Sequence, residues 1–173
     1  MLIETDRLLF RPLRVADAEA LASMWSDPEV TRFMGGPRDP AELSRSLEKR
    51  AREDGAAAEI DLWPVVERSS GRIVGHCGLL EKEVEGRGEI ELIYVFARAA
   101  WGKGYATEAA EALKRYAFNR LALPRIIALI DPDNAASERV AVKVEMRFER
   151  DTLRPSGKTL RLYAAVARTP ERP

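Results

Sequence analysis

The most informative stretch of the chain is residues 94–108, YVFARAAWGKGYATE. Its pattern predicts a strand, a short loop with Gly102 and Gly104, and the beginning of a long helix. Glycines in such a loop let the main chain approach a ligand closely. The first N–H groups of a helix have no partner within the helix, and the helix dipole places positive potential beside them. With Lys103 as a movable cation, the stretch predicts a cradle for an anion such as a pyrophosphate.

Two other phosphate-binding motifs do not fit this loop. Lys103 lies between the glycines and no Gly-Lys-Ser/Thr ends the run, so it is not a Walker loop. A dinucleotide fingerprint has three spaced glycines early in a βαβ unit, whereas this strand follows two other strands late in the chain. A bare Gly-x-Gly after a strand is also compatible with a simple tight turn.

Composition restricts the function classes. The chain has 173 residues, enough for one domain, and its 28 basic and 28 acidic side chains give a net charge of zero. A sequence-wide basic field is therefore excluded, and we expect no nucleic-acid partner. One Cys and one His predict neither a disulfide nor a metal site. No apolar run approaches a membrane span and acids stand at Glu4 and Asp6, so we expect no membrane association, no signal peptide and a cytoplasmic location.

The remaining sequence predicts a single domain over residues 1–168, with a frayed tail at 169–173. Periodicity and turn residues give the order β-α-α-β-β-β-α-β-α-β-β. We expect the strands at residues 7–13, 63–67, 72–82, 89–96, 125–130, 148–153 and 159–167, and the helices at 17–27, 39–52, 105–121 and 134–144.

Four segments resemble the GNAT (Gcn5-related) N-acetyltransferases. Residues 101–109, WGKGYATEA, resemble the acetyl-CoA loop of that family. Residues 5–12, 73–78 and 134–143 resemble the opening, central strand and late helix of its RimJ/RimL-like branch, which acetylates the N-termini of ribosomal proteins. The resemblance implies an α+β fold, the GNAT acyl-CoA N-acyltransferase fold, with a mixed, mostly antiparallel twisted sheet and about four flanking helices.

The resemblance also implies where acetyl-CoA binds. Main-chain groups of Tyr94, Val95 and Phe96 would pair with the pantetheine arm, and the strands that hold Tyr94 and Ile130 would splay apart to admit it. Asn134 would bind the pantetheine or shape its channel, and Ser137 would lie near the departing sulfur. The pyrophosphate would be held by backbone N–H groups of Trp101, Gly102, Lys103, Gly104, Tyr105 and Ala106.

Four positions depart from the family pattern. Ala99 stands where relatives often have Gln or Arg, and Ile93 replaces a usual Gly, which could alter a local bulge. Ala141 occupies the place where many relatives carry a Tyr as general acid, so the acid is unassigned. Glu145 replaces a usual Gly after the late helix, which removes the favoured C-terminal cap.

Transfer of an acetyl group to an amine needs a neutral amine held near the carbonyl and a stabilised oxyanion. Glu89 and Glu91 share one face of a strand, and Glu91 is our first candidate for the base because it is nearer the loop. A strand glutamate is also often a solvated residue or a cross-strand partner. The N–H of Val95 is the simplest oxyanion donor. Ser137 is a candidate to assist the thiol, or else a helix-cap hydroxyl.

Other reactive side chains are better explained structurally. His76 lies in an apolar strand and is predicted to be structural, and Cys77 to be a small buried thiol. Glu108 opposes the helix dipole and receives no catalytic role. The basic residues Arg45, Lys49, Arg50 and Arg52 predict a solvated helix face or, less simply, a surface for an acidic partner.

The sequence therefore predicts an acyltransferase that moves acetyl from acetyl-CoA to a primary amine, either a protein N-terminus or a small amine. Direct attack in a ternary complex is favoured because no activated nucleophile is visible. The alternatives are a CoA-binding sensor or scaffold without catalysis and, more weakly, a nucleotide-phosphate binder. The acceptor is not identified, and a homodimer through the C-terminal strands rests on family analogy alone.

Overall fold

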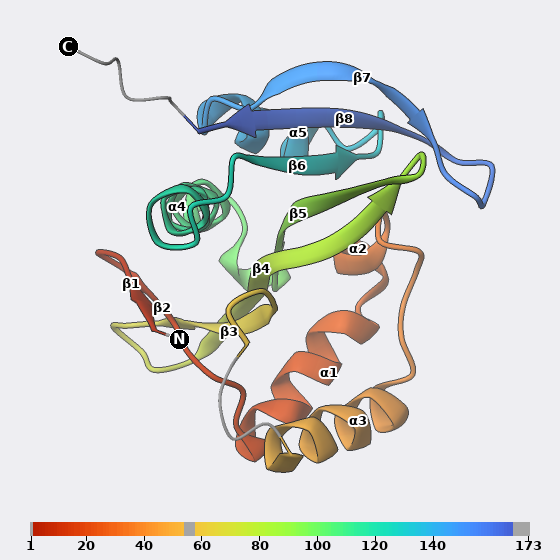
Figure 1. Cartoon of the computed structure of the whole chain (residues 1–173). Coiled ribbons are helices and arrows are strands. Elements are labelled where there is room, and N and C mark those ends of the chain that lie inside the picture. The colour runs from red at the N-terminus through yellow and green to blue at the C-terminus, as the bar shows by residue number, and fades with distance from the viewer. Residues whose placement is uncertain (1, 54–57, 168–173) are drawn as a thin grey trace.

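The computed structural model describes residues 2–53 and 58–167, and its eight strands form one sheet (Figure 1). Their order across the sheet is β1-β2-β3-β4-β5-β6-β8-β7. Neighbouring strands are antiparallel except for β5 and β6, which are parallel. The strands are β1 (Ile3–Glu4), β2 (Leu8–Phe10), β3 (Leu62–Glu67), β4 (Ile73–Val84), β5 (Arg87–Phe96), β6 (Arg125–Ile130), β7 (Arg147–Leu153) and β8 (Thr159–Val166).

Helices cover both faces of the sheet. Residues of α4 and α5 form one hydrophobic cluster with the inward side chains of β3 to β6, while α1 and α3 form a second cluster with Val95. The α-helices are α1 (Ala18–Ser26), α2 (Pro28–Thr31), α3 (Pro40–Glu53), α4 (Tyr105–Arg115) and α5 (Ala135–Lys143). Short turns of helix precede or follow them at η1 (Val15–Asp17), η2 (Arg98–Ala100) and the π-helical η3 (Tyr116–Arg120).

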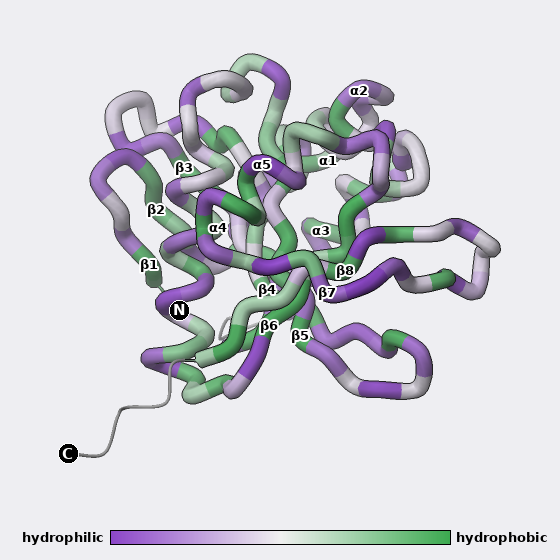
Figure 2. Tube along the Cα trace, turned by 90° about the horizontal axis from the view of Figure 1, so that it is seen from above, coloured by the Kyte–Doolittle hydropathy of each residue, from purple (hydrophilic) through white to green (hydrophobic). Residues whose placement is uncertain are grey.

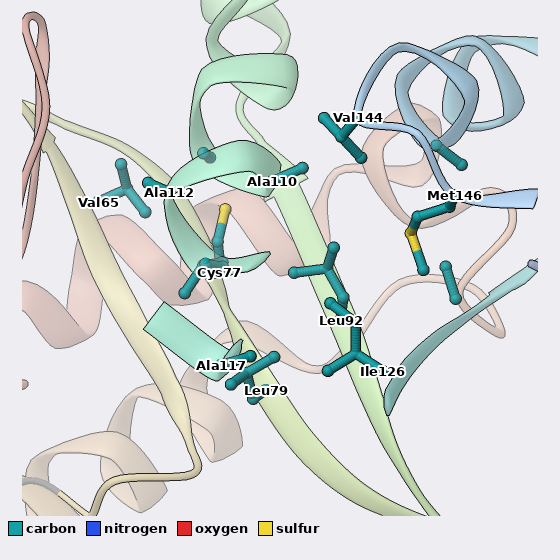
Figure 3. Packing of buried hydrophobic residues seen from close by; sticks show 14 of the residues in the cluster. Val65, Cys77, Leu79, Leu92, Ala110, Ala112, Ala117, Ile126, Val144 and Met146 are labelled. Atoms are coloured by element: carbon teal, nitrogen blue, oxygen red, sulfur yellow. The ribbon is translucent and has the colours of Figure 1, made fainter. Parts of the chain in front are cut away.

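Small side chains bring α4 close to the sheet. Figure 3 shows Ala112 and Ala117 beside Val65, Cys77 and Leu79, and all five are buried. In Figure 2 the hydrophobic colour follows the central strands and the outer turns are hydrophilic. The buried alanines of α4 and η3 therefore form part of the surface by which this segment packs on the sheet.

Most predicted elements are confirmed, with differences near the N-terminus. The strand β1 is too short to give a pattern and was not predicted. Asp27 and Pro28 end α1 as expected, but Asp27 then accepts the N–H of Glu29 and begins the short α2. The predicted tail at 169–173 lies outside the described residues. No helix among the described residues is long and apolar enough to cross a membrane.

One glycine of the central strand is required by a close approach of two chains. A Cβ at Gly78 would lie 1.8 Å from the carbonyl oxygen of Asp61. That carbonyl accepts the N–H of Leu79 at 3.0 Å, so Asp61 is fixed against β4. Residue 78 must therefore be glycine, because any side chain there would collide with the backbone of Asp61.

The pair β5–β6 provides the opening on which the site depends. Within the described residues its register consists of a single pair, Glu91 with Ile127. Pairing stops before Tyr94 and Ile130, as the predicted splay requires. A gap therefore opens in the middle of the sheet, beside the end of β5 that leads into the glycine loop.

Candidate active site

The glycine loop presents a row of unpaired N–H groups. The N–H of Trp101 donates to Arg98 at 3.0 Å, and that of Glu108 donates to Gly104 at 3.1 Å. Between them, the N–H groups of residues 102–107 donate to no atom of the described part of the chain. Gly102 and Gly104 have φ of +74° and +80°, which L-residues with side chains rarely adopt. The unpaired N–H groups that the predicted cradle requires are present, but they begin at Gly102, because the N–H of Trp101 is used within η2.

The beginning of α4 is held by contacts to distant strands. The Tyr105 hydroxyl donates to the carboxylate of Glu67 at the end of β3. The guanidinium of Arg7 lies 4.6 Å from the centre of the Tyr105 ring. These contacts fix the first residue of the helix, and with it the direction of the loop amides.

Glu108 connects α4 to the N-terminal segment. Its carboxylate accepts from the Thr5 hydroxyl at 2.6 Å, and from the Arg7 N–H at 3.0 Å and Nε at 2.7 Å. Arg7 Nη1 also donates to the carbonyl of Lys103, within the loop, at 2.8 Å. Burial alone would raise the pKa of Glu108, but the bonds from Thr5 and Arg7 outweigh it and hold that pKa below its usual value. We call this set of contacts the Arg7–Glu108 latch.

Sequence reasoning missed the latch. It gave Glu108 only an interaction with the helix dipole, and it used Thr5 and Arg7 only as part of a resemblance. A signal was present, since Thr-x-Arg in the opening segment supplies the donors that a carboxylate in the first turn of α4 accepts. Sequence spacing alone does not bring residues about a hundred positions apart together.

The edge of β5 that faces the gap belongs to Tyr94 and Phe96. The N–H of Ala97 donates to Val74 at 2.9 Å, and the β4–β5 register is unbroken from Gly75–Phe96 to Val84–Arg87. Residues in an antiparallel pair alternate between facing the partner and facing away. Val95 therefore directs its N–H and C=O toward β4. Because these groups do not face the gap, we do not assign Val95 the predicted roles of oxyanion donor and main-chain partner of pantetheine.

The β4–β5 ladder has no bulge at Ile93. A bulge would have shifted the alternation, but the register passes Ile93 without a shift. The Phe96 carbonyl is already bonded, because Trp101 Nε1 donates to it at 2.8 Å. The N–H and C=O of Tyr94 and the N–H of Phe96 thus remain as the main-chain groups at the open end of the gap.

The beginning of α5 closes the other side of the gap. Asn134 Oδ1 accepts the N–H of Ser137 at 3.1 Å, so Asn134 is the N-cap of this helix. Ser137 is not the cap. Its Oγ lies 2.9 Å from the Tyr94 hydroxyl, which also lies 3.0 Å from the Ser137 carbonyl. The side chain of Tyr94 therefore joins β5 to α5.

Glu91 lies on the opposite face of the sheet, at the point where β5 and β6 part. Its side chain is 11% exposed, and Lys82 Nζ lies 3.9 Å from Oε2. Burial raises the pKa of Glu91, against the effects of Lys82, Arg154 and the backbone N–H of Leu129. Glu89 instead accepts from Arg125 Nε at 3.1 Å. Of the two candidate bases, Glu91 is the one whose environment favours proton uptake.

The remaining side chains singled out in the sequence have structural surroundings. His76 accepts a hydrogen bond from Trp25 Nε1 at 3.1 Å, and burial lowers its pKa to about 4. Burial raises the pKa of the Cys77 thiol. Ala141 is fully buried against the core. Three of the basic side chains of α3 pair with acids: Lys49 with Glu53, Arg50 with Asp61, and Arg52 with Glu48.

Comparison with known proteins agrees with this geometry. The model of the acetyltransferase (GNAT) domain matches residues 7–147. The chain belongs to the GNAT acetyltransferase family. YkkB of Bacillus subtilis (strain 168), an uncharacterized protein, is 33% identical over 160 residues, 92% of each chain. The uncharacterized N-acetyltransferase p20 of Bacillus licheniformis is 29% identical over 92% of this chain and 91% of its own.

A solved structure gives the same result for the fold. A GNAT-family acetyltransferase from Bacillus anthracis superposes with a TM-score of 0.81 at 30% identity, covering 96% of this chain and 98% of that one. The mixed, mostly antiparallel sheet with helices on both faces is thus the GNAT fold, as predicted. The glycine loop, the gap between β5 and β6 and Glu91 lie within the matched residues.

Proposed function

We propose that this GNAT protein transfers the acetyl group of acetyl-CoA to a primary amine by direct attack in a ternary complex. The observation that carries the proposal is the row of unpaired N–H groups at residues 102–107, beside the open end of the β5–β6 gap. A diphosphate has the charge and the acceptor atoms that such a row of donors can satisfy.

The residues present fit coenzyme A. A Cβ at Gly102 would meet nothing within 4 Å, so the loop has open space on that side. The free C=O of Tyr94 and N–H of Phe96 can pair with the amides of a pantetheine arm as an added strand would. The predicted ligands Gly102, Lys103, Gly104, Tyr105 and Ala106 thus remain in the proposal. Asn134 keeps a channel-shaping role, because its side-chain oxygen is committed to capping α5.

The bound thioester supplies an electrophilic carbonyl, and the chain supplies the proton acceptor. An α-amino group has a pKa of about 8 and a lysine side chain about 10.4, so an N-terminal amine is easier to deprotonate. Glu91, buried and with a raised pKa, is placed to take that proton directly or through water. The N–H of Tyr94 replaces that of Val95 as the candidate oxyanion donor.

Protein N-termini are the first acceptors to test. The ribosomal-protein acetyltransferase RimL, solved in complex with coenzyme A, shares the fold with a TM-score of 0.73 at 15% identity. That identity supports the fold alone, so the RimJ/RimL-like branch, the amine and the possibility of a homodimer are parts of the proposal. An amine panel with short peptides of varied first residue, together with small amines, would identify the acceptor.

A pair of glycine variants tests the cradle itself. Gly102→Glu adds a carboxylate where the diphosphate would lie, whereas Gly86→Glu adds one at the β4–β5 turn, at the other end of β5. Both positions have similar φ, +74° and +77°, and open space around a Cβ, so the backbone cost is matched. We expect Gly102→Glu to abolish CoA binding and Gly86→Glu to preserve it. Equal CoA affinity in the two variants would contradict the proposed site.

A CoA-binding module without catalysis is the second candidate. It is favoured by one observation, the buried Ala141 at the position where many relatives have a tyrosine. Thermal stabilisation by CoA without acetyl-CoA consumption over the whole amine panel would support the module and contradict the enzyme.

A further inference from the structure

The turn between β4 and β5 contains a strained glutamate. Val84 pairs with Arg87, so Glu85 and Gly86 form a two-residue turn, and their φ angles are +51° and +77°. A two-residue turn with positive φ at both positions favours Asn-Gly, and a glutamate at the first position carries a conformational cost. The carboxylate of Glu85 makes contacts that account for its presence in this turn.

The side chain of Glu85 joins this turn to β7, the edge strand of the sheet (Figure 1). Its carboxylate accepts from the buried Thr152 hydroxyl at 2.8 Å and from Arg150, whose Nε lies at 3.4 Å and Nη2 at 3.2 Å. The bonds from Thr152 and Arg150 hold the pKa of Glu85 below its usual value. Beside them, Arg154 Nη1 donates to the carbonyl of Glu83 at 3.2 Å. We call these contacts the Glu85 clasp.

The clasp holds the β4–β5 hairpin over one face of the sheet. Val84, the last residue of β4, is fully buried although the turn that follows it is exposed. It packs in a cluster with Ile127 of β6 and Leu162 of β8, which are also fully buried. Ile127 is the residue that pairs with Glu91 in the register of β5 and β6. Paired residues point to the same face of a sheet, so the cluster that the clasp closes adjoins Glu91.

We propose that the Glu85 clasp is a positioning device for acetyl transfer, because it holds the β4–β5 hairpin closed and keeps water away from Glu91. This inference rests on the proposed function, in which the proton of the attacking amine passes from its nitrogen to the Glu91 carboxylate. The residues of the clasp exchange no proton in that step and act only through Glu91.

The charges around Glu91 show why the exclusion of water matters. Burial raises the pKa of Glu91, whereas Lys82 of β4 and Arg154 of β7 oppose that shift. Glu89, two residues earlier on β5, is paired with Arg125 of β6 at 3.1 Å. The neighbouring cations therefore favour the ionised carboxylate, and burial is what makes Glu91 a stronger proton acceptor.

Two variants open the clasp from opposite sides. Glu85→Asn creates the Asn-Gly turn that hairpins favour and shortens the side chain that reaches Thr152, so the turn itself should not be weakened. Thr152→Val removes the hydroxyl and keeps the size of the side chain. The matched control is Glu149→Gln, because Glu149 also pairs with Arg150, at 2.9 Å, and is 40% exposed against 44% for Glu85.

The test measures the pKa of Glu91 from the ¹³C shift of its side-chain carboxyl against pH, with Glu91→Gln to assign the resonance. We expect Glu85→Asn and Thr152→Val each to lower that pKa by about one unit, a tenfold change in proton affinity. The double variant should lower it no further than the larger single effect, because both changes break the same contacts. Glu149→Gln should leave it unchanged.

Turnover provides a second measurement. In both clasp variants kcat should fall by up to about tenfold, because a less basic carboxylate accepts the amine proton less readily. The KM for acetyl-CoA should not change, because the clasp lies at the opposite end of β5 from the glycine loop. Glu149→Gln should keep the kcat of the wild type.

Two results would overturn the inference in distinguishable ways. An unchanged pKa of Glu91 in both clasp variants would show that the clasp does not control the surroundings of Glu91, and the proposed function would still stand. If the wild type transfers acetyl to no amine, the proposed function fails, and the clasp has no part in catalysis even where the pKa falls. Should one variant fail to fold, the other still gives the reading.

Discussion

Breaking the Arg7–Glu108 latch should weaken CoA binding although neither side chain lies in the row of loop amides. Glu108→Gln preserves the shape of the side chain but removes its charge and one acceptor oxygen. Glu108 accepts from Thr5, from the Arg7 N–H and from Arg7 Nε at 2.6–3.0 Å. A hydrogen bond to a charged group contributes about 1.5–3 kcal/mol when buried, but the Arg7 side chain is 48% exposed and solvent screens it. We expect a loss of about 1–2 kcal/mol in the free energy of unfolding.

The effect on binding follows from the loop. Arg7 Nη1 donates to the Lys103 carbonyl, so breaking the latch frees Lys103, the residue between the two glycines. Ordering the backbone of one residue costs about 1–2 kcal/mol in conformational entropy. In the variant, this cost is subtracted from the free energy of CoA binding. The dissociation constant for CoA, measured by calorimetry, should rise about tenfold. Arg7→Lys keeps the charge but loses the planar guanidinium, so it should raise the dissociation constant for CoA to a similar extent. The double variant should bind CoA no more weakly than either single variant, because both changes break the same set of contacts.

The control is Glu48→Gln, which breaks a Glu–Arg pair on α3, far from the loop. It should leave CoA affinity unchanged. If Glu108→Gln lowers thermal stability yet binds CoA as tightly as the wild type, the latch stabilises the fold without organising the cradle, and the reasoning is refuted.

Three further predictions concern single residues. Glu91→Gln should lower turnover strongly with little change in CoA affinity. It should not destabilise the fold at neutral pH, because it removes a buried charge. Full activity of this variant would exclude Glu91 as the base. His76 has a pKa of about 4 in the fold against 6.5 unfolded, so the unfolded state gains the proton first. Stability should fall by about 3 kcal/mol as pH drops from 6.5 to 4, and urea unfolding of His76→Gln should lack that slope. Glu145 follows α5 with φ +63°, and its N–H donates to the carbonyl of Val142. Because glycine adopts this conformation without strain, Glu145→Gly should raise the free energy of unfolding by about 1 kcal/mol. A lower midpoint of thermal unfolding would contradict this.

The order of elements and the cradle could be predicted because local chemistry determines them. Asp39 and Pro40 begin α3 and the two glycines begin α4, and each signal lies next to the element that it controls. Which edge of β5 faces the gap could not be predicted, because it depends on the register of the ladder with β4. The roles predicted for Val95 depend on that register.

Long-range side-chain contacts form the second group that the sequence could not predict. The latch joins Arg7 to Glu108, and the Tyr94 hydroxyl meets Ser137 across the gap. Each pair consists of ordinary polar residues whose separate surroundings give no signal. Only the folded sheet places the N-terminal segment against α4, and β5 against α5.

The central claim is that the main-chain amides at the beginning of α4 bind the diphosphate of coenzyme A. The most direct measurement is a titration of ¹⁵N-labelled protein with CoA, followed through the amide resonances. We predict the largest shifts at residues 102–106, with the resonances of Gly86 and the α3 residues unchanged. Saturable binding of CoA that leaves the resonances of residues 102–106 in place, with the large shifts elsewhere, would contradict the claim.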